Sequence, residues 1–80
     1  MKLAVIRSLA ETQNLEALKQ LEELLLNGEN LPIEVGGEDE GEQLTHILGA
    51  IDILERVKNE GIDVRTAIRG FSERVRNSIS

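Results

Sequence analysis

The 80-residue sequence contains no cysteine, tryptophan or tyrosine, and it has a single phenylalanine, a single proline and a single histidine. Without cysteine the chain can form neither a disulfide nor a zinc–thiolate or iron–sulfur site. With Phe71 as its only aromatic residue, it lacks the ring platforms on which nucleobases stack and the aromatic cages that hold quaternary ammonium ions. The core must therefore be built from leucine, isoleucine and valine.

The sequence also lacks a long apolar run. No stretch approaches the roughly 20 apolar residues that cross a bilayer. Arg7 and Glu11 interrupt the apolar opening "MKLAVIRSLAETQ" before the hydrophobic region of a signal peptide is complete. We therefore expect a cytoplasmic protein that has no membrane partner.

Basic residues are scarce in the first half of the chain. Residues 1–42 carry ten acids and three bases, a net charge of −7, whereas residues 43–80 carry five acids and six bases, a net charge of +1. An acidic chain repels nucleic acid. We therefore expect no nucleic-acid partner unless a local basic surface overrides the net charge.

Four segments carry apolar residues at the spacing of an α-helix. We expect helices over residues 2–13, 14–28, roughly 40–60 and 64–79. The first two should form a hairpin. The predicted fold is a single all-α domain, a compact bundle of three or four helices.

Residues with known preferences mark the ends of these segments. Asn14 and Asp63 are side chains that cap helix N-termini, and Gly61 is typical of a helix C-terminus. Pro32 excludes a helix from "ENLPIEVGGEDE", residues 29–40. We expect a loop there, with a two- or three-residue β-bridge at "IEV" as an alternative.

The third segment carries its apolar residues along two seams. The first contains Leu44, Ile47, Leu48, Ile51 and Leu54, and the second contains Ala50, Ile53 and Val57. This arc of roughly 220° is wider than the roughly 100° of a one-sided surface helix. We therefore expect the third helix to be central in the bundle.

The two seams also suggest self-association. A small domain often needs help from disulfides, metals or oligomerisation, and a lone chain of this length should have too few elements to cover both seams. We expect a homodimer in which one seam packs within the chain and the other, with the fourth helix, packs against the partner. The inward residues predicted for the fourth helix are Val64, Ala67, Ile68, Phe71, Val75 and Ile79.

Gly49 and Gly70 lie inside predicted helices. A glycine there costs roughly 1 kcal/mol relative to alanine. We expect both to mark points where helices cross too closely for a side chain, the alternative being chance tolerance.

The stretch "GEDEGEQLTH", residues 37–46, contains the chain's only histidine. Glu42 and His46 are four residues apart, so they share a helical face and could bind one metal ion or act as a base and its orienting partner. Neither a di-iron pattern, nor a calcium loop, nor a nucleophile motif accompanies them. This pair is the weak candidate for a metal-dependent enzyme, and we expect no cofactor.

A simpler interpretation of the same stretch is electrostatic. Glu38, Asp39, Glu40 and Glu42 stand where a helix begins, and carboxylates there interact favourably with the unsatisfied N–H groups of the first turn. We favour an exposed acidic helix start, followed by His46 as the first residue to face the interior.

Arg65, Arg69 and Arg76 form a basic stripe on the fourth helix, opposite its apolar face. Such a stripe could contact phosphates, or it could pair with the acids of residues 38–42 within one chain or across a dimer. The net charge of −6 favours ion pairing or a solvated surface over nucleic acid.

Both ends of the chain resemble a known family. "MKLAVIRSL" and "GAIDILERVKNEGIDVRTAIRGFSERVRNSI" are similar to small, uncharacterised bacterial proteins, chiefly from the Bacteroidota, in which a Gly-Ala-Ile segment precedes Gly, Phe and Arg-Val. The matching positions are Gly49, Ala50, Ile51, Gly61, Ala67, Phe71, Arg74, Val75, Ser78 and Ile79. The resemblance covers about half of the chain, and the acidic middle departs from it.

The resemblance implies no catalytic residue. Because such proteins are encoded beside thioredoxin or peroxiredoxin proteins, it implies a thiol-redox setting, in which a chain without cysteine would act as a partner. We therefore favour a non-enzymatic interaction or scaffold module that acts as a homodimer with an unidentified protein partner. The alternative is a small metal-dependent enzyme centred on Glu42 and His46.

Overall fold

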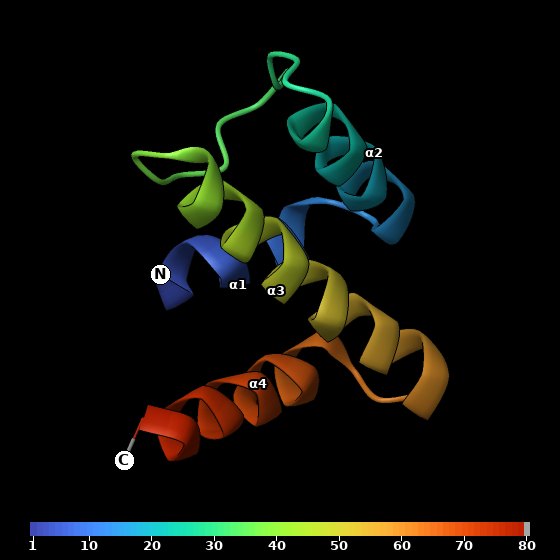
Figure 1. The fold of residues 1–80 in the computed structure, drawn as a ribbon. Coiled ribbons are helices and arrows are strands. Elements are labelled where there is room, and N and C mark those ends of the chain that lie inside the picture. The colour runs from blue at the N-terminus through green and yellow to red at the C-terminus, as the bar shows by residue number, and fades with distance from the viewer. Residues whose placement is uncertain (80) are drawn as a thin grey trace.

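The computed structural model describes the backbone of residues 1–79 and the side chains of residues 1–78. This part of the chain forms the helices α1 (Leu3–Thr12), α2 (Leu15–Leu26), α3 (Glu40–Glu60) and α4 (Val64–Ile79) (Figure 1). The predicted all-α class is confirmed. Residues 1–79 contain no strand, and the β-bridge considered for the 29–40 loop is absent because that loop has no extended neighbour to pair with. The prediction that Ile79 points inward lies outside the described side chains.

The helices begin and end where the capping residues predict. The Oδ1 atom of Asn14 accepts the backbone N–H of Ala17 at 2.7 Å, and that of Asp63 accepts the backbone N–H of Thr66 at 2.7 Å. Gly61 ends α3 in the left-handed conformation, with φ of 67°, which glycine adopts without steric cost. Local side-chain chemistry therefore sets these boundaries.

Helix α3 is the centre of the fold, as predicted. Helices α1, α2 and α4 all pack on it, and α4 also touches α1 (Figure 1). The predicted hairpin is wrong, because within residues 1–79 α1 and α2 do not pack on each other. Gln13 and Asn14, which join them, are both extended, with ψ of 160° and 169°, so α2 leaves α1 and packs separately on α3.

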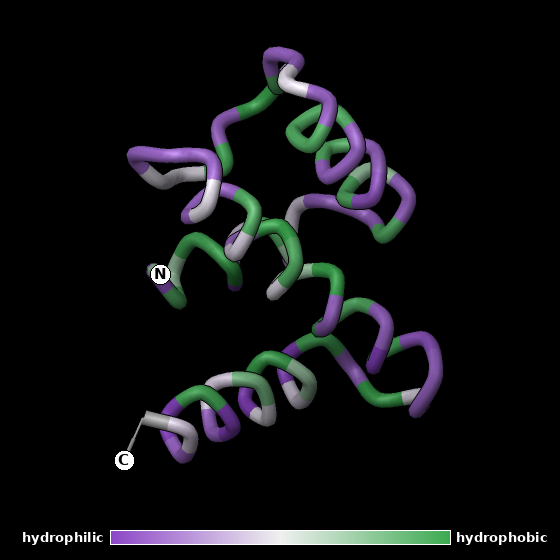
Figure 2. The backbone as a smooth tube through the Cα atoms, in the orientation of Figure 1, coloured by the Kyte–Doolittle hydropathy of each residue, from purple (hydrophilic) through white to green (hydrophobic). Residues whose placement is uncertain are grey.

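The core gathers around α3. Its buried apolar residues are Ile6, Leu9, Ala10, Leu18, Leu21, Leu25, Val35, Ile47, Ala50, Ile51, Ile53 and Ala67. Figure 2 shows apolar positions on each helix interrupted by hydrophilic ones, as expected for helices that are each partly exposed to solvent.

A single chain covers most of both seams of α3. Ile47 and Ile51 of the first seam are 0% and 8% exposed, and Ala50 and Ile53 of the second are both 0% exposed. The premise that one chain has too few elements to cover both seams is therefore wrong, because α1 and α2 each cover α3 instead of each other. The predicted homodimer needs a different physical basis.

The other predicted seam residues are less covered. Leu48 is 43% exposed, and the remaining ones are partly buried, namely Leu44, Leu54, Val57, Ile68, Phe71 and Val75. In α4 only Ala67 is fully buried among the described side chains. Helix α4 is therefore the element that the rest of the chain covers least.

The two glycines predicted to mark helix crossings, Gly49 and Gly70, differ. A Cβ atom on Gly49 would lie 3.0 Å from Cδ1 of Ile6 and 3.1 Å from Cζ of Phe71, so α1, α3 and α4 meet there as predicted. A Cβ atom on Gly70 would meet only Nη1 of Arg74, at 3.6 Å. The close crossing predicted at Gly70 is therefore wrong.

Candidate functional site

His46 is fully buried and both of its ring nitrogens contact backbone groups. Its Nε2 atom accepts the backbone N–H of Lys2 at 3.0 Å, and its Nδ1 atom lies 2.9 Å from the carbonyl oxygen of Val35 and 3.2 Å from that of Gly36. Because Nε2 accepts, the ring proton must sit on Nδ1 and be donated to the loop carbonyls. The imidazole therefore joins the start of α1, the 29–40 loop and α3.

The local sequence places His46 in this position. Asp39 caps α3, since its Oδ1 atom accepts the backbone N–H of Glu42 at 2.8 Å. His46 is then the first fully buried residue of the helix. Gly36 has φ of 69°, and a Cβ atom there would lie 3.1 Å from Val5 and 3.4 Å from Nδ1 of His46. The loop can pass this close to the imidazole because residue 36 is glycine.

Glu42 and His46 are engaged separately. The carboxylate of Glu42 lies 3.9 Å from the amine of Met1, while a metal ion would have to displace Lys2 from Nε2 of His46. Among the described residues no three metal-ligating side chains come together. The geometry therefore gives both residues structural contacts, and the metal-dependent alternative centred on them stays a prediction.

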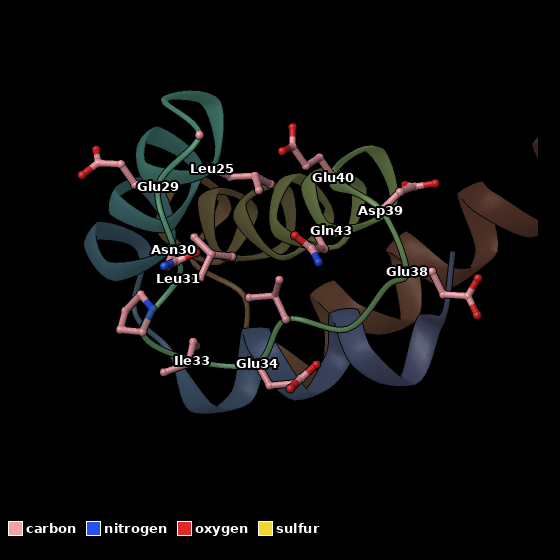
Figure 3. A pocket seen from close by; sticks show the side chains of 13 residues that line it. Leu25, Glu29, Asn30, Leu31, Ile33, Glu34, Glu38, Asp39, Glu40 and Gln43 are labelled. Carbon is pink, nitrogen blue, oxygen red and sulfur yellow. The ribbon is translucent and has the colours of Figure 1, made fainter.

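A pocket lies beneath the 29–40 loop, between the end of α2 and the start of α3 (Figure 3). Leu25 and Leu31 contribute to its wall, and Gln43 points into it. Carboxylates spread around its edge, from Glu29, Glu34, Glu38, Asp39 and Glu40. No lysine or arginine lines it, so its electrostatic character is anionic.

The basic stripe lies on α4. Arg65, Arg69 and Arg76 are exposed, and in the described part of the chain no carboxylate lies within ion-pair distance of them. The ion pairs predicted between this stripe and the acids of residues 38–42 therefore do not form within one chain. Pairing between two copies stays a prediction.

The remaining three arginines are all paired. Arg7 lies 3.5 Å from Glu11, Arg56 lies 3.2 Å from Glu60, and Arg74 lies 2.6 Å from Asp52. Three of the six arginines are therefore paired with acids, and the three of the stripe are not.

Helices α2 and α3 run in opposite directions. Lys19 of α2 lies 3.6 Å from Glu55, near the end of α3, whereas Leu25, at the end of α2, lines the same pocket as Gln43, at the start of α3. The Lys19–Glu55 ion pair therefore marks a face that the two helices share.

Two exposed leucines lie on that face. Leu26 lies two helical turns after Lys19 on α2, and Leu48 lies two turns before Glu55 on α3. Because the two helices run in opposite directions, both leucines are displaced from the ion pair in the same direction along the helix axes. Leu26 is 65% exposed and Leu48 is 43% exposed. We call this pair the leucine patch. Sequence reasoning missed Leu26, although Leu24, Leu25 and Leu26 are consecutive and cannot all share one buried stripe.

In the described part of the chain, no helix has both the length and the apolarity needed to cross a bilayer. Over residues 1–80 the chain matches a family of unknown function, DUF6952, and it belongs to that family. The match includes the acidic middle, so it extends the resemblance noted at the two ends to the whole chain. No curated protein and no solved structure matches the chain.

Proposed function

We propose that this DUF6952 member is a non-enzymatic protein-interaction module that acts in the cytoplasm as a homodimer. The observation that carries the proposal is the leucine patch, in which Leu26 and Leu48 expose 65% and 43% of their surface on one face of α2 and α3. Removing apolar surface from water is favourable, so an association that covers the leucine patch should be favoured. A two-fold interface would set the same patch of both copies face to face.

The surroundings of the leucine patch suit an interface. The Lys19–Glu55 ion pair, with side chains 54% and 46% exposed, lies on the same face, two helical turns from each leucine. Interfaces commonly place apolar residues at the centre and exposed polar groups at the rim. The patch therefore offers a small apolar centre with a polar edge, and a second copy supplies a surface of the same shape and chemistry.

The chemistry of the chain favours binding over catalysis. The imidazole of His46 would have to be within reach of a reacting group to serve as a base, yet it is 0% exposed and bonded to backbone groups on both nitrogens. Its contacts support a structural role, and we assign no catalytic residue.

Analytical ultracentrifugation at micromolar concentration tests the dimer. We expect the wild-type chain to sediment as a dimer at high ionic strength and Leu48→Glu or Leu26→Glu to sediment as a monomer, because a charge would then be buried in the interface. Gln20→Glu is the matched control, since it adds the same charge to an exposed position of α2 that does not share the face of Leu26.

Circular dichroism should show unchanged helix content in all three variants, because the substituted side chains are exposed. A monomeric wild-type chain, or a dimer that both leucine variants retain, would contradict the proposal.

A further inference from the structure

Two unpaired surfaces of opposite charge face away from each other. The first, the arginine stripe, consists of Arg65, Arg69 and Arg76 on α4. The second, the acidic loop, is the 29–40 segment with the carboxylates of Glu29, Glu34, Glu38, Asp39 and Glu40, all of them exposed. Neither surface has a counter-charge in an ion pair within the described residues.

The acids nearest the stripe do not neutralise it. Glu11 lines the cleft between α1 and α4 with Arg65 and Arg69, but its carboxylate pairs with Arg7. Asp63 precedes α4 and caps it through Thr66. It also interacts electrostatically with Arg65 and Arg69 but forms no ion pair with them, so one carboxylate acts against three arginines. Glu73 lies within one turn of two stripe residues, is exposed, and is joined to neither of them by an ion pair. The stripe therefore presents its positive charge to solvent.

The acidic loop is free of bases along its whole length. No lysine or arginine occurs in residues 29–42, and Figure 3 shows the labelled side chains of Glu38 and Asp39 directed away from the pocket. Asp39 caps α3, but Glu34 and Glu38 have no such role. Ile33, in the same loop, is 37% exposed, which gives the loop an apolar contact beside its charges.

The arginine stripe has a matching apolar neighbour. Ile68, partly buried, lines the α1–α4 cleft together with Arg65 and Arg69. Both surfaces therefore combine charges of one sign with an accessible isoleucine, and the two signs are opposite.

The two surfaces cannot meet within one chain. Helix α4 packs on α3 and α1 and makes no contact with α2 in the described residues, whereas the acidic loop follows α2 and passes over the start of α3. In Figure 1 the loop and α4 lie on opposite sides of α3. A contact between the surfaces requires a second copy of the chain.

We propose that the arginine stripe of one copy docks on the acidic loop of a second copy in a head-to-tail contact. The inference rests on the proposed function in treating the chain as a self-associating module, but it uses surfaces separate from the leucine patch. A head-to-tail contact between two copies leaves the stripe of one copy and the loop of the other free. Further copies can therefore bind at these two ends until a ring closes or the assembly stops. The chain itself supplies a complementary acidic partner, which favours this occupant over a nucleic acid.

The first test is the dependence of the assembly on salt. Exposed charges are screened over about 10 Å at 0.1 M ionic strength and about 3 Å at 1 M. We expect the weight-average mass from sedimentation equilibrium to exceed that of the dimer at low salt and to return to the dimer at high salt. Leu48→Glu should lose the dimer at high salt and retain the salt-sensitive association.

The second test exchanges the charges. The basic variant is Arg65→Glu with Arg69→Glu, and the acidic variant is Glu34→Lys with Glu38→Lys. The basic variant sets a stripe of net charge −1 against the acidic loop, so it should lose the salt-sensitive association. The acidic variant lowers the net charge of its loop from −5 to −1, so its association should weaken. In an equimolar mixture the unchanged stripe of the acidic variant meets the unchanged loop of the basic variant, so the association should return.

The control for the exchange reverses two exposed acids elsewhere. Glu16→Lys with Glu23→Lys, on α2, changes the net charge as much as the acidic variant does. This variant should retain its own salt-sensitive association, because its stripe and its loop are unchanged. Loss of that association in the control would show a general effect of net charge and would overturn the proposal.

The outcomes separate this inference from the proposed function. A wild-type dimer with no salt-sensitive growth, or growth that survives charge reversal, overturns the inference and leaves the dimer standing. A salt-sensitive association without a dimer at high salt supports the inference and overturns the dimer. Salt-sensitive binding of mixed-sequence DNA that the basic variant loses, without self-association, would replace the proposal with a nucleic-acid surface.

Discussion

The backbone N–H of Lys2 donates a hydrogen bond to Nε2 of His46 at 3.0 Å, and this bond ties the start of α1 to the core helix α3. The other ring nitrogen of His46 reaches the carbonyl oxygen of Val35 at 2.9 Å. Helix α1 has no side-chain cap at Lys2. The imidazole therefore satisfies a backbone donor at the point where a capping side chain would otherwise act.

Replacing His46 should destabilise the fold strongly. His46→Ala leaves a cavity and removes the partner of a backbone N–H and of a backbone carbonyl, so we expect the free energy of unfolding to fall by about 2 to 4 kcal/mol. Urea denaturation measures it. Thr45→Ala, at an exposed neighbouring position, should change it by less than about 0.5 kcal/mol. Equal effects at the two positions would contradict a structural role for the imidazole.

Divalent metal ions should not stabilise the protein. Zinc needs an available imidazole lone pair, and the one on Nε2 of His46 is occupied by Lys2. We expect the melting temperature to be unchanged by equimolar zinc, and the purified protein to contain no stoichiometric metal by elemental analysis. Stoichiometric metal that disappears in His46→Ala would establish the metal-dependent alternative.

Gly49 and Gly70 should respond to alanine in opposite ways. A Cβ atom on Gly49 would press against Ile6 and Phe71, so Gly49→Ala should cost about 1 to 3 kcal/mol through overpacking. A Cβ atom on Gly70 would meet only Nη1 of Arg74, at an ordinary contact distance of 3.6 Å, so Gly70→Ala should raise the free energy of unfolding by roughly 1 kcal/mol through helix propensity. Stabilisation by both substitutions would show that the crossing at Gly49 can relax.

The difference between these glycines shows what the sequence could predict. Helical spacing and capping residues such as Asn14 and Asp63 determine each helix by local chemistry, so the helix positions were predicted within a residue or two. The same spacing places His46 at the first inward position of α3. Whether a glycine lies at a helix crossing depends on where a second helix packs. The local sequences around Gly49 and Gly70 do not contain that information, so the two glycines could not be told apart.

Longer-range relations could not be predicted in this way. Periodicity shows which side of α1 and α2 is apolar, but it does not show that both helices choose α3 instead of each other. The extended conformation of Gln13 and Asn14 decides that choice. The leucine patch was missed for the same reason, because it requires knowing that Lys19 lies beside Glu55.

The N-terminal cap of α4 should make stability depend on acidic pH. Hydrogen bonds from the backbone and side chain of Thr66, and then the charges of Arg65 and Arg69, hold the pKa of Asp63 below its ordinary 3.8. A lowered folded-state pKa means that the ionised carboxylate stabilises the fold. Its contribution is complete above the ordinary pKa and is lost as the pH falls through the folded value.

Asp63→Asn tests this dependence, because asparagine keeps a capping oxygen but does not titrate in this range. We expect the melting temperature of the variant to fall less than that of the wild-type chain between about pH 5 and about pH 2. Parallel profiles for the two proteins would show that Asp63 contributes nothing through its charge.

The last prediction compares arginines on the two sides of α4. The Nη2 atom of Arg74 lies 2.6 Å from Oδ2 of Asp52, and its guanidinium carbon lies 5.7 Å from the centre of the Phe71 ring, so it links α4 to α3. An exposed ion pair and a cation–π contact are each modest, and Arg74→Ala should lower the free energy of unfolding by about 1 kcal/mol. In this variant Nε of Arg56 still lies 3.5 Å from the carboxylate of Asp52. The negative charge of Asp52 therefore keeps a positive partner, which limits the loss of stability.

The arginine stripe should behave differently, because its three side chains make no ion pair within the described chain. In a dilute sample, where copies are dissociated, the triple change of Arg65, Arg69 and Arg76 to alanine should shift the melting temperature less than Arg74→Ala does, and by a few degrees at most. Thermal unfolding followed by circular dichroism compares the two variants directly. A larger shift for the triple change would mean that the stripe makes stabilising contacts inside one chain. A negligible shift in monomer stability, together with loss of the salt-sensitive association, would place its contribution between copies.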